Sequence, residues 1–452
     1  MYFVDPFSLT RNMDLGGCRS IMADELIKLD TRKPAVKVLM IVTLVFALVW
    51  SWFVVRWYIG NTMAEYLNPE EHSLAMAGRA ISLAPNDPLT HWRLGEFTQK
   101  QLPPEHLAQA ISEYETAVSL APNDYRLWLS LGTALEEHGE VEKAEKALRR
   151  SVELAPSYSY PAWYLGNLLL RRGRYEEAFA ELRRASENDS ELRPQLFNLA
   201  WEVYSKDFES LRAVVGPMGR AHFAQYLLDR DQFDDGLRMW FSLNETEKRS
   251  NRDAVKAIIN RLLAAKRYQD AMAVWNDSAD LPAYHAEVGK VLDGGFEENF
   301  PHGPDTVFGW QVKPDQQVQI GIDPRSGNTG RRSLRLTFQV PSRLDVISVS
   351  QLVAVQPAAD YDFECFVKTE DLASGATPII QIVDPVNGAV IASTSEAPTG
   401  DNPWQRLHAM FKTGDKTQAI IVRVGRAACD DNDVCPIYGS VSYDDFSLTR
   451  RD

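Results

Sequence analysis

The pentapeptide LAPND stands at residues 83–87 and again at residues 120–124, and LAPS follows at residues 154–157. Pro122 and Pro156 are 34 residues apart, while Pro85 and Pro122 are 37 apart, which is 34 plus a three-residue insertion near QLPPEH. A fixed period of this length is typical of stacked helical hairpins, because one hairpin cannot bury its apolar face alone. The repeat therefore predicts an array of paired helices.

Positions within each repeat can be compared with a known pattern. In residues 125–158, the places that tetratricopeptide repeats give to Trp, Leu, Gly, Ala and Pro are held by Trp128, Leu131, Gly132, Ala144 and Pro156. The chain thus resembles the tetratricopeptide family across residues 88–192. Degenerate repeats, each with a helix–turn–helix pattern, continue to about residue 285. We expect residues 60–285 to form an α-helical superhelix of about six such hairpins.

The first helix of each hairpin lines a concave groove in that family. A groove of this kind binds a segment of a protein partner, so the resemblance implies a protein-binding site. By family register its residues are Trp92, Arg126, Trp163, Asn167, Arg171, Phe197 and Trp201. The alternative is that several of these aromatic side chains pack between repeats.

Upstream of the repeats, residues 38–55 read VLMIVTLVFALVWSWFVV and carry no charge. Eighteen helical residues span about 27 Å, close to the thickness of the hydrocarbon core of a bilayer. Trp50, Trp52, Trp57 and Tyr58 crowd the C-terminal end, as residues of an interfacial aromatic belt do. We predict a single transmembrane helix over residues 38–59, and the alternative is a buried core helix.

Charge around this segment predicts its orientation. The basic residues Lys28, Arg32, Lys33 and Lys37 precede it, whereas no Lys or Arg occurs between Arg56 and Arg79. The positive-inside rule places residues 1–37 in the cytoplasm and residues 60–452 outside it. In a bacterium, the chain would then be a single-pass protein of the inner (cytoplasmic) membrane with its bulk in the periplasm.

Composition and motifs narrow the class of function. The net charge of −14 and the pI of about 5.2 argue against nucleic-acid binding, which usually needs a basic face. The sequence contains no G-x-S-x-G, H-E-x-x-H or P-loop motif. We therefore predict a protein that is not an enzyme.

After residue 300 the hydrophobic period changes from the helical one to two. SLRLTFQV (333–340), YDFECFVK (361–368) and QAIIVRVG (418–425) alternate apolar and polar residues, and five further segments do so more weakly. Turn residues separate these segments. The pattern predicts an antiparallel β-sandwich of the jelly-roll type over residues 286–452.

Several motifs of this region occur in a familiar order. LDGGFEENF (292–300) comes first, followed by FGW (308–310), SGNTGRRSLRL, PWQRLHAMF and YDDFSL (443–448). The set resembles the carbohydrate-binding-module jelly rolls of the galactose-binding-like superfamily. The resemblance makes LDGGFEENF the opening strand, and it implies a structural calcium ion held by Glu297 and Asp445 with help from Asp293. The alternative is that these acids are turn and edge residues without a metal.

The same resemblance implies a sugar-binding face on the sandwich. The outward-facing candidates for glycan contacts are Gln351, Glu364, Gln381, His408 and Arg423. Trp310 and Trp404 lie on motifs whose tryptophans more often pack the core of the family. The ligand of this face is therefore expected to be a glycan or a second protein.

Two cysteines, Cys429 and Cys435, bracket the acidic segment DDNDV. A separation of six residues allows them to meet across a loop, and we expect a disulfide there, which an oxidising compartment would favour. The alternative is two free thiols. Cys365 is expected to be a buried, inert side chain.

Together these patterns predict a membrane-anchored, non-catalytic scaffold with no cofactor other than the calcium ion. The repeat groove would bind a protein and the sandwich a glycan or protein, in a setting such as surface-polysaccharide or envelope-complex assembly. One alternative is an accessory structural subunit of a larger membrane complex with no glycan binding. Another is a cryptic glycan-active enzyme, which would need paired carboxylates in a cleft.

Overall fold

The protein is described from a computed structural model, which covers residues 33–68, 73–100, 105–205, 207–278, 285–298, 306–313, 316–341, 349–429 and 434–451. The chain divides into two compact units, Met1–Pro156 and Ser157–Asp452, and each is described by itself. Most of the predicted cytoplasmic tail, including Lys28 and Arg32, lies outside the described residues.

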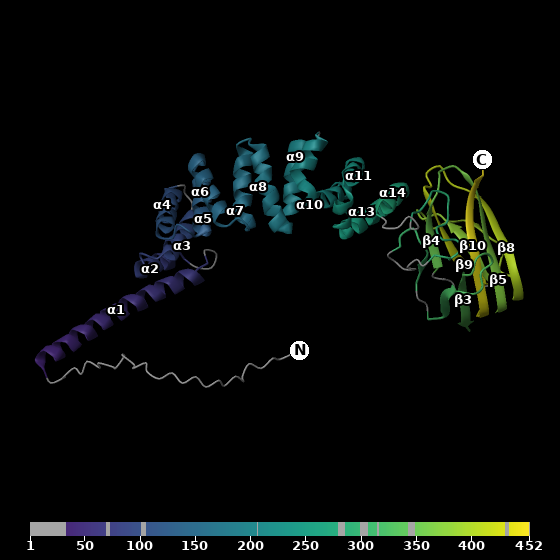
Figure 1. Cartoon of the computed structure of the whole chain (residues 1–452), viewed down its shortest axis with the longest axis horizontal. Coiled ribbons are helices and arrows are strands. Elements are labelled where there is room, and N and C mark those ends of the chain that lie inside the picture. The colour runs from purple at the N-terminus through teal and green to yellow at the C-terminus, as the bar shows by residue number, and fades with distance from the viewer. Residues whose placement is uncertain are drawn as a thin grey trace, which may run out of the picture. The chain divides into compact units, whose positions relative to one another are not determined.

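Helices make up the first unit, and consecutive helices pack as hairpins (Figure 1). Their bounds are α1 Pro34–Tyr66, α2 Leu74–Leu83, α3 Pro88–Gln99, α4 Glu105–Leu120, α5 Tyr125–Glu137 and α6 Val141–Leu154.

The repeated LAPND segment joins one hairpin to the next. Its last residue caps the following helix: Asp87 accepts a hydrogen bond from the backbone N–H of Leu89 at 2.9 Å, and Asp124 accepts one from Arg126 at 3.0 Å. Asparagine and aspartate at this position satisfy N–H groups that the helix leaves unpaired. The repeated sequence thus fixes where α3 and α5 begin.

Small residues let the two helices of a hairpin approach closely, as the repeat pattern predicts. A Cβ atom at Gly132 would lie 2.7 Å from the Leu148 side chain, and one at Gly166 in the second unit would lie 2.7 Å from the Leu182 side chain. In each pair the two residues are sixteen positions apart, on the first and second helix of one hairpin.

Helix α1 is longer than the predicted transmembrane segment. It runs unbroken from Pro34 to Tyr66, so the predicted boundary between residues 59 and 60 falls inside it. By length and composition it could cross a membrane, and none of its most apolar window is buried in the protein. Its last turns pack against α2 and α3, where Ala64 is fully buried.

The second unit begins with further helices. They are α7 Ser159–Arg171, α8 Tyr175–Asn188, the 3₁₀ turn η1 Ser190–Leu192, α9 Arg193–Tyr204, α10 Phe208–Asp229, α11 Phe233–Phe241, α12 Glu245–Arg249, α13 Arg252–Ala264 and α14 Tyr268–Ser278. Helix α10 is two helices joined at a kink, because Gly216 has φ 70° and Pro217 follows it.

Strands form the C-terminal part of this unit, as two antiparallel sheets (Figure 1). One sheet has the order β1-β4-β9-β6-β7 and the other β2-β3-β10-β5-β8. The strands are β1 Gln311–Val312, β2 Val318–Asp323, β3 Ser333–Val340, β4 Val349–Ala354, β5 Asp360–Ser374, β6 Pro378–Val383, β7 Val390–Ser393, β8 Gly400–Lys412, β9 Ala419–Arg426 and β10 Ile437–Arg451. The predicted sandwich is present, and the sequence pattern missed β1 and β2.

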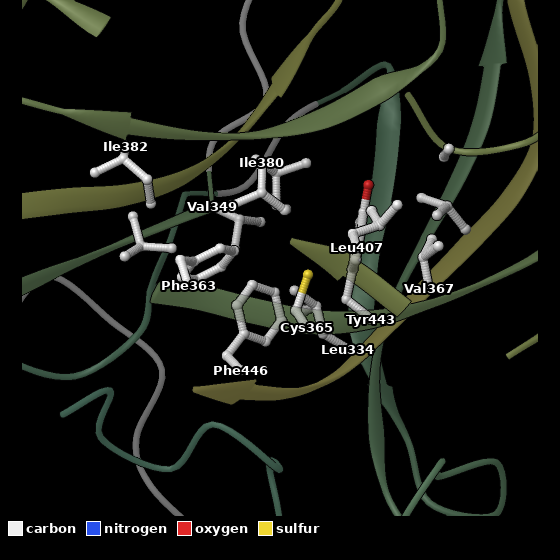
Figure 2. Close-up of a cluster of buried hydrophobic side chains, with 14 of the residues drawn as sticks. Leu334, Val349, Phe363, Cys365, Val367, Ile380, Ile382, Leu407, Tyr443 and Phe446 are labelled. Carbon is white, nitrogen blue, oxygen red and sulfur yellow. The ribbon is translucent and has the colours of Figure 1, made fainter. Parts of the chain in front are cut away.

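The core of the sandwich lies between the two sheets. Figure 2 shows Val349, Ile380 and Ile382 of the first sheet near Phe363 and Cys365 of the second. Cys365 is fully buried, as expected, and burial raises the pKa of its thiol. The apolar residues at alternate positions of these strands therefore point into the core, as the period of two predicts.

Residues 292–298, the described part of LDGGFEENF, do not form the expected opening strand. Residues 293–296 form a turn in which Asp293 and Phe296 both have positive φ, and Phe296 is fully buried against Trp310 and Phe446. Gly294 accepts a hydrogen bond from the N–H of Phe446 at 2.9 Å. A Cβ atom at Gly294 would overlap the carbonyl oxygen of Phe446, so the chain enters the sandwich as a tight turn against β10.

Side chains also join the sandwich to the last helical hairpin of the same unit. The rings of Trp275 on α14 and Phe308 are 6.2 Å apart, edge to face. The Gln269 amide donates to the carbonyl oxygen of Val355 at 3.2 Å. Leu352 of β4 packs against the helical core. One edge of the outer surface of the first sheet is therefore covered by helices.

Candidate functional site

A pocket of about 370 Å³ opens on the first helices of consecutive hairpins in the first unit. Helix α1 contributes Asn61 and Glu65, α3 contributes Trp92 and Arg93, and the start of α5 contributes Arg126. The pocket therefore lies on the surface that tetratricopeptide register assigns to the groove. It brings together Trp92 and Arg126, which are two of the seven predicted groove residues.

Trp92 is the aromatic element of this pocket and is half-buried. Its indole N–H donates to the Ser130 hydroxyl at 2.9 Å, which fixes the ring between α3 and α5. The guanidinium carbons of Arg93 and Arg126 lie 4.7 and 5.6 Å from the ring centroid. Cations at this range are attracted to the face of an indole, so the ring is held before any ligand arrives.

The rim of the pocket carries an ion pair. Arg126 contacts Asp124 at 2.6 Å between Nη2 and Oδ2, and its Nε also donates to that carboxylate. The side-chain hydrogen bond from Arg126 lowers the pKa of Asp124, and the same bond raises the pKa of Arg126. Both groups are therefore ionised at neutral pH and present paired charge beside an apolar ring.

The other five predicted groove residues belong to the second unit. Trp163, Asn167 and Arg171 lie on one face of α7, spaced four residues apart. Trp163 is half-buried against the helical core, the Asn167 amide donates to the carbonyl oxygen of Trp163 at 2.9 Å, and Arg171 is exposed. This face of α7 is therefore available to a partner, although its tryptophan also packs.

Phe197 does not belong to a binding surface. It is 3% exposed, and its ring lies 5.1 Å from that of Phe223 in the helical core. Trp201 is half-buried and packs against the same core. For Phe197 the packing alternative is correct, because helix α10 folds over α9 and covers it.

Sequence reasoning missed two groups of residues at these surfaces. Tyr160 and Tyr164 on α7 are strongly exposed beside Trp163, and the tyrosine-rich run SYSYPAWY was a visible signal. Asn61 and Glu65 were missed because they follow the apolar segment and precede the first recognisable repeat. No pattern in the sequence indicates that α1 also serves as a hairpin helix.

The predicted calcium ligands lie near one another at the entrance of the sandwich. Glu297 accepts hydrogen bonds from the backbone N–H groups of Arg331 and Arg332 at 2.6 and 2.8 Å. Asp445 accepts one from the Asn328 amide at 2.7 Å. In the part of the chain that the structure describes, no group of three or more His, Cys, Asp or Glu side chains is placed to hold a metal. Donors from residues 328–332 satisfy these two acids.

Asp444 is fully buried at this entrance, and Asp293, the third predicted calcium ligand, is half-buried. Desolvation raises the pKa of Asp293 to about 6 and that of Asp444 to about 6. Asp444 accepts hydrogen bonds from the N–H groups of Asn328 and Asp445, whereas Oδ2 of Asp293 is buried without a hydrogen-bond partner. Oδ2 of Asp293 is thus the carboxylate oxygen here that could still bind a cation or a hydrogen-bond donor.

Among the predicted glycan contacts, Gln351 is wrong. It is 1% exposed, and its side-chain amide forms two hydrogen bonds to the backbone of Leu292, at 2.9 Å through Oε1 and 2.8 Å through Nε2. It faces inward because it shares the phase of Val349 and Val353 on β4. The side chain therefore ties the entrance turn to the sheet.

The other four candidates lie on the outer faces of the two sheets. His408 is exposed directly opposite Glu364, which forms an ion pair of 2.6 Å with Arg406. On the other sheet, Arg423 donates to Gln381 at 2.8 Å. The candidates thus form two separate polar patches, one on each sheet.

The tryptophans of the sandwich offer little stacking surface. Trp310 is 3% exposed and donates to the backbone oxygen of Asp293 at 3.1 Å. Trp404 is half-buried on β8.

The predicted disulfide between Cys429 and Cys435 is present. Arg426, which is buried, holds the end of the loop by donating to the carbonyl oxygen of Cys435 at 2.8 Å and to that of Ala376 at 2.8 Å.

Comparisons with known proteins agree with the helical part of this description. The sequence model of the tetratricopeptide repeat family matches residues 105–159, which include α4, α5 and α6. No curated protein sequence matches the chain.

Three solved structures illustrate the likeness. MamA residues 41 to the end, from Desulfovibrio magneticus RS-1, is 17% identical, covering 36% of this chain and 90% of that one with a TM-score of 0.29. A MamA RS-1 double mutant is 21% identical over 30% and 74% of the two chains, with a TM-score of 0.26. YrrB, a TPR protein with an unusual peptide-binding site, is 14% identical over 45% and 91%, with a TM-score of 0.24.

The evidence for the repeats is the family match over residues 105–159 and the close packing of the two helices in each hairpin. The chain contains tetratricopeptide repeats, which typically form non-catalytic scaffolds for protein interactions, followed by an antiparallel β-sandwich.

Proposed function

We propose that this protein is a membrane-anchored, non-catalytic scaffold whose repeat groove binds a segment of a partner protein. The observation that carries the proposal is the pocket around Trp92, where an oriented indole, apolar side chains and an ion pair meet on the groove side of three helices. A partner segment would place an apolar side chain against the indole and use its backbone or polar groups at Arg126 and Glu65.

Anchoring would come from α1, which spans the bacterial inner membrane in this proposal. The apolar, uncovered window of the helix and the basic residues Lys33 and Lys37 at its start support this placement, with the N-terminus in the cytoplasm. The bulk of the chain would then lie in the periplasm, where the disulfide between Cys429 and Cys435 is stable.

The sandwich would supply a second binding surface on the outer face of the β5–β8 sheet, for a glycan or a second protein. Glu364, Arg406 and His408 give this surface charge and hydrogen-bonding groups. The burial of Gln351 and Trp310 removes two of the side chains that a sugar site would use. Such a scaffold fits the assembly of a surface polysaccharide or of an envelope complex.

The proposal includes a structural calcium ion at the sandwich entrance, held by Glu297 and Asp445 with help from Asp293, whose Oδ2 has no hydrogen-bond partner. The test is thermal unfolding with calcium and with a chelator, run together with binding of the chain to a glycan array. Stabilisation by calcium and binding to a glycan class support the two finer proposals. An unchanged unfolding midpoint and an empty array contradict them.

A second candidate, an accessory structural subunit, is favoured by the packing of the sandwich on the last hairpin. Trp275 and Phe308 form that contact, so the head is joined to the helices as a continuous body within the second unit. A subunit of this kind would be recovered in a fixed ratio with a membrane complex and would bind no glycan.

The groove is tested by affinity capture of full-length protein from detergent-solubilised membranes of its host. Trp92→Ala with Arg126→Ala removes the indole and one of its cations. Lys143→Ala is the matched control, since its side chain is 65% exposed on α6, the second helix of its hairpin. We expect a partner captured by the wild type and the control to be lost from the groove variant. A partner retained equally by all three proteins would contradict the groove.

A further inference from the structure

The apolar surface of α1 does not end where the predicted transmembrane segment ends. A groove of about 400 Å³ between the end of α1 and α2 is lined by Tyr58, Ile59, Met63, Tyr66 and Met76, among others. Tyr58 is 63% exposed and Tyr66 is 76% exposed. Large apolar and aromatic side chains thus stay uncovered by the first unit for two turns beyond residue 59.

The helix that carries this surface is fixed to the first hairpin. Gly60 comes so close to α2 that a Cβ atom would lie 2.8 Å from the carbonyl oxygen of Ala80. The Asn61 amide donates to Asp87 at 3.0 Å, and Arg93 donates to the carbonyl oxygen of Ala64 at 2.9 Å. The end of α1 and the start of the repeats therefore move as one body.

This attachment determines the depth of the groove in a membrane. Tyr66 lies eight residues beyond Tyr58, which is about 12 Å along the helix axis. The polar layer on each side of a bilayer is roughly 5–8 Å thick, and spanning helices tilt by about 20° on average. With Tyr58 at the edge of the hydrocarbon, the backbone of Met63 lies about 7 Å beyond that edge, within the polar layer, and the backbone of Tyr66 about 11 Å beyond it. The Tyr66 ring leans back toward the helix N-terminus, as long side chains in helices do, and so reaches toward that layer.

The side chains that flank the groove are basic, which suits a layer of lipid phosphates. Helix α2 contains no acidic residue and carries an exposed Arg79. Arg56 on α1 donates to the carbonyl oxygen of Ser82, near the end of α2. Arginine pairs well with phosphate, and aromatic side chains favour the interface between hydrocarbon and water.

We propose that the groove between α1 and α2 is a lipid-binding surface, so that the first hairpin of the repeats is embedded in the headgroup layer of the membrane. Tyr58 and Ile59 contact the upper acyl chains, Tyr66 and Met76 lie among the headgroups, and Arg56 and Arg79 contact lipid phosphates. The inference rests on the anchoring part of the proposed function. It adds that the Trp92 pocket, which shares α1, is held next to the membrane surface, where a juxtamembrane segment of a partner would reach it.

The test uses single-cysteine variants of the full chain in a Cys18→Ser background, since Cys365 is buried and the other two cysteines form the disulfide. Tyr66→Cys and Met76→Cys report on the groove, Trp52→Cys on the predicted span, and Lys143→Cys on a surface of α6. Each is labelled with a polarity-sensitive fluorophore and reconstituted in vesicles of zwitterionic and anionic phospholipids. Some of these lipids carry a nitroxide quencher, placed either at the headgroup or deep in the acyl chain.

We expect headgroup nitroxides to quench more than about half of the fluorescence at positions 66 and 76, as an interfacial location requires. Acyl-chain nitroxides should quench position 52, and neither should quench position 143. Arg56→Gln with Arg79→Gln should weaken the headgroup quenching in anionic vesicles.

The outcomes separate the two proposals. If positions 66 and 76 behave like position 143 while position 52 is quenched, the anchor stands and the lipid-binding groove is overturned. If position 52 also behaves like position 143, the anchor itself fails. If positions 66 and 76 are shielded from an aqueous quencher but not quenched by lipid, a second copy or another protein covers the groove, and the inference is overturned.

Discussion

Gly132 in the repeats and Gly294 in the sandwich both sit where two parts of the chain come very close. The neighbour of Gly132 is the side chain of Leu148, sixteen residues later in the same hairpin. The neighbour of Gly294 is the backbone of Phe446, more than 150 residues later on the last strand. The repeats are thus built from local contacts with side chains that can adjust, and the sandwich is closed by a distant contact with backbone that cannot.

Substituting Gly294 with alanine should have the largest effect. A Cβ atom there would overlap the carbonyl oxygen of Phe446, so the entrance turn must move away from β10 and expose Phe296. We expect the free energy of unfolding of the sandwich to fall by more than about 3 kcal/mol. The overlapping atom belongs to the backbone, so no side-chain rotation can relieve the overlap. Tryptophan fluorescence and limited proteolysis of the full chain measure it.

Gly375→Ala is the matched control, because no atom lies within 4 Å of a Cβ atom at that position. It should leave unfolding almost unchanged. Equal effects at the two glycines would show that backbone contact at Gly294 does not close the sandwich.

The disulfide provides a contact of short range within the sandwich, and breaking it should have a smaller effect. Cys429→Ser with Cys435→Ser removes a bridge across six residues. For so short a ring, the loss is expected to be about 2–3 kcal/mol. Arg426 should keep the strand ends in place. Complete unfolding of the sandwich in this variant would mean that the local bridge matters more than the distant contact at Gly294.

Gly132→Ala should cost less again. The added methyl group overlaps the buried side chain of Leu148, which destabilises the hairpin by about 1–3 kcal/mol. Alanine also has a higher helix propensity than glycine, which stabilises the helix by about 1 kcal/mol. We expect a net loss near 1 kcal/mol in thermal or urea unfolding. Gly78→Ala on α2 is the control, with open space around it, and should be neutral or stabilising. A loss at Gly132 as large as that at Gly294 would remove the distinction between the two regions.

The smallest effect concerns the entrance carboxyl Asp293. Burial raises the pKa of this carboxyl from 3.8 to about 6, so the folded chain holds the proton more tightly than the unfolded chain does. Its contribution to stability is fully present below pH 3.8 and is lost as the pH rises through about 6. Because water screens the partly buried group, we expect a loss on the order of 1 kcal/mol.

Asp293→Asn should remove this part of the decline in the unfolding midpoint between pH 4 and pH 7, as linkage requires. The shifted pKa of Asp444 leaves a residual slope. Asp415→Asn, at an exposed position, is the control and should retain the full decline. An unchanged pH dependence in Asp293→Asn would contradict the role given to this carboxyl.

The features that could be predicted from the sequence are those that depend on residues close together in the chain. The period of 34, the LAPND caps and Gly132 act over short distances, so their helices, turns and close contacts follow from the residues nearby. The strand pattern was equally local, and SLRLTFQV corresponds to β3 from end to end. The cysteine pair needed only a short separation.

Contacts between distant segments explain what could not be predicted. The family resemblance predicts a strand at residues 292–297, but they form a turn that is hydrogen-bonded to the distant Phe446. The polar character of Gln351 predicts an outward-facing side chain, but its phase on β4 turns it inward, where it bonds to the backbone N–H and C=O of Leu292. Phe197 matches the groove register, yet the next helix, α10, covers it. The Trp92 pocket depends on Asn61 and Glu65, which only the continuation of α1 brings to it.

Binding of a partner protein to the groove side of the repeats can be detected by site-specific photo-crosslinking in intact host membranes. A photoreactive amino acid replaces Arg126 in one full-length protein and Lys143 in another. We expect one discrete protein adduct from position 126, which is lost when Trp92 is also replaced by alanine, and no such adduct from position 143. The same adduct at both positions, or none at position 126, would contradict it.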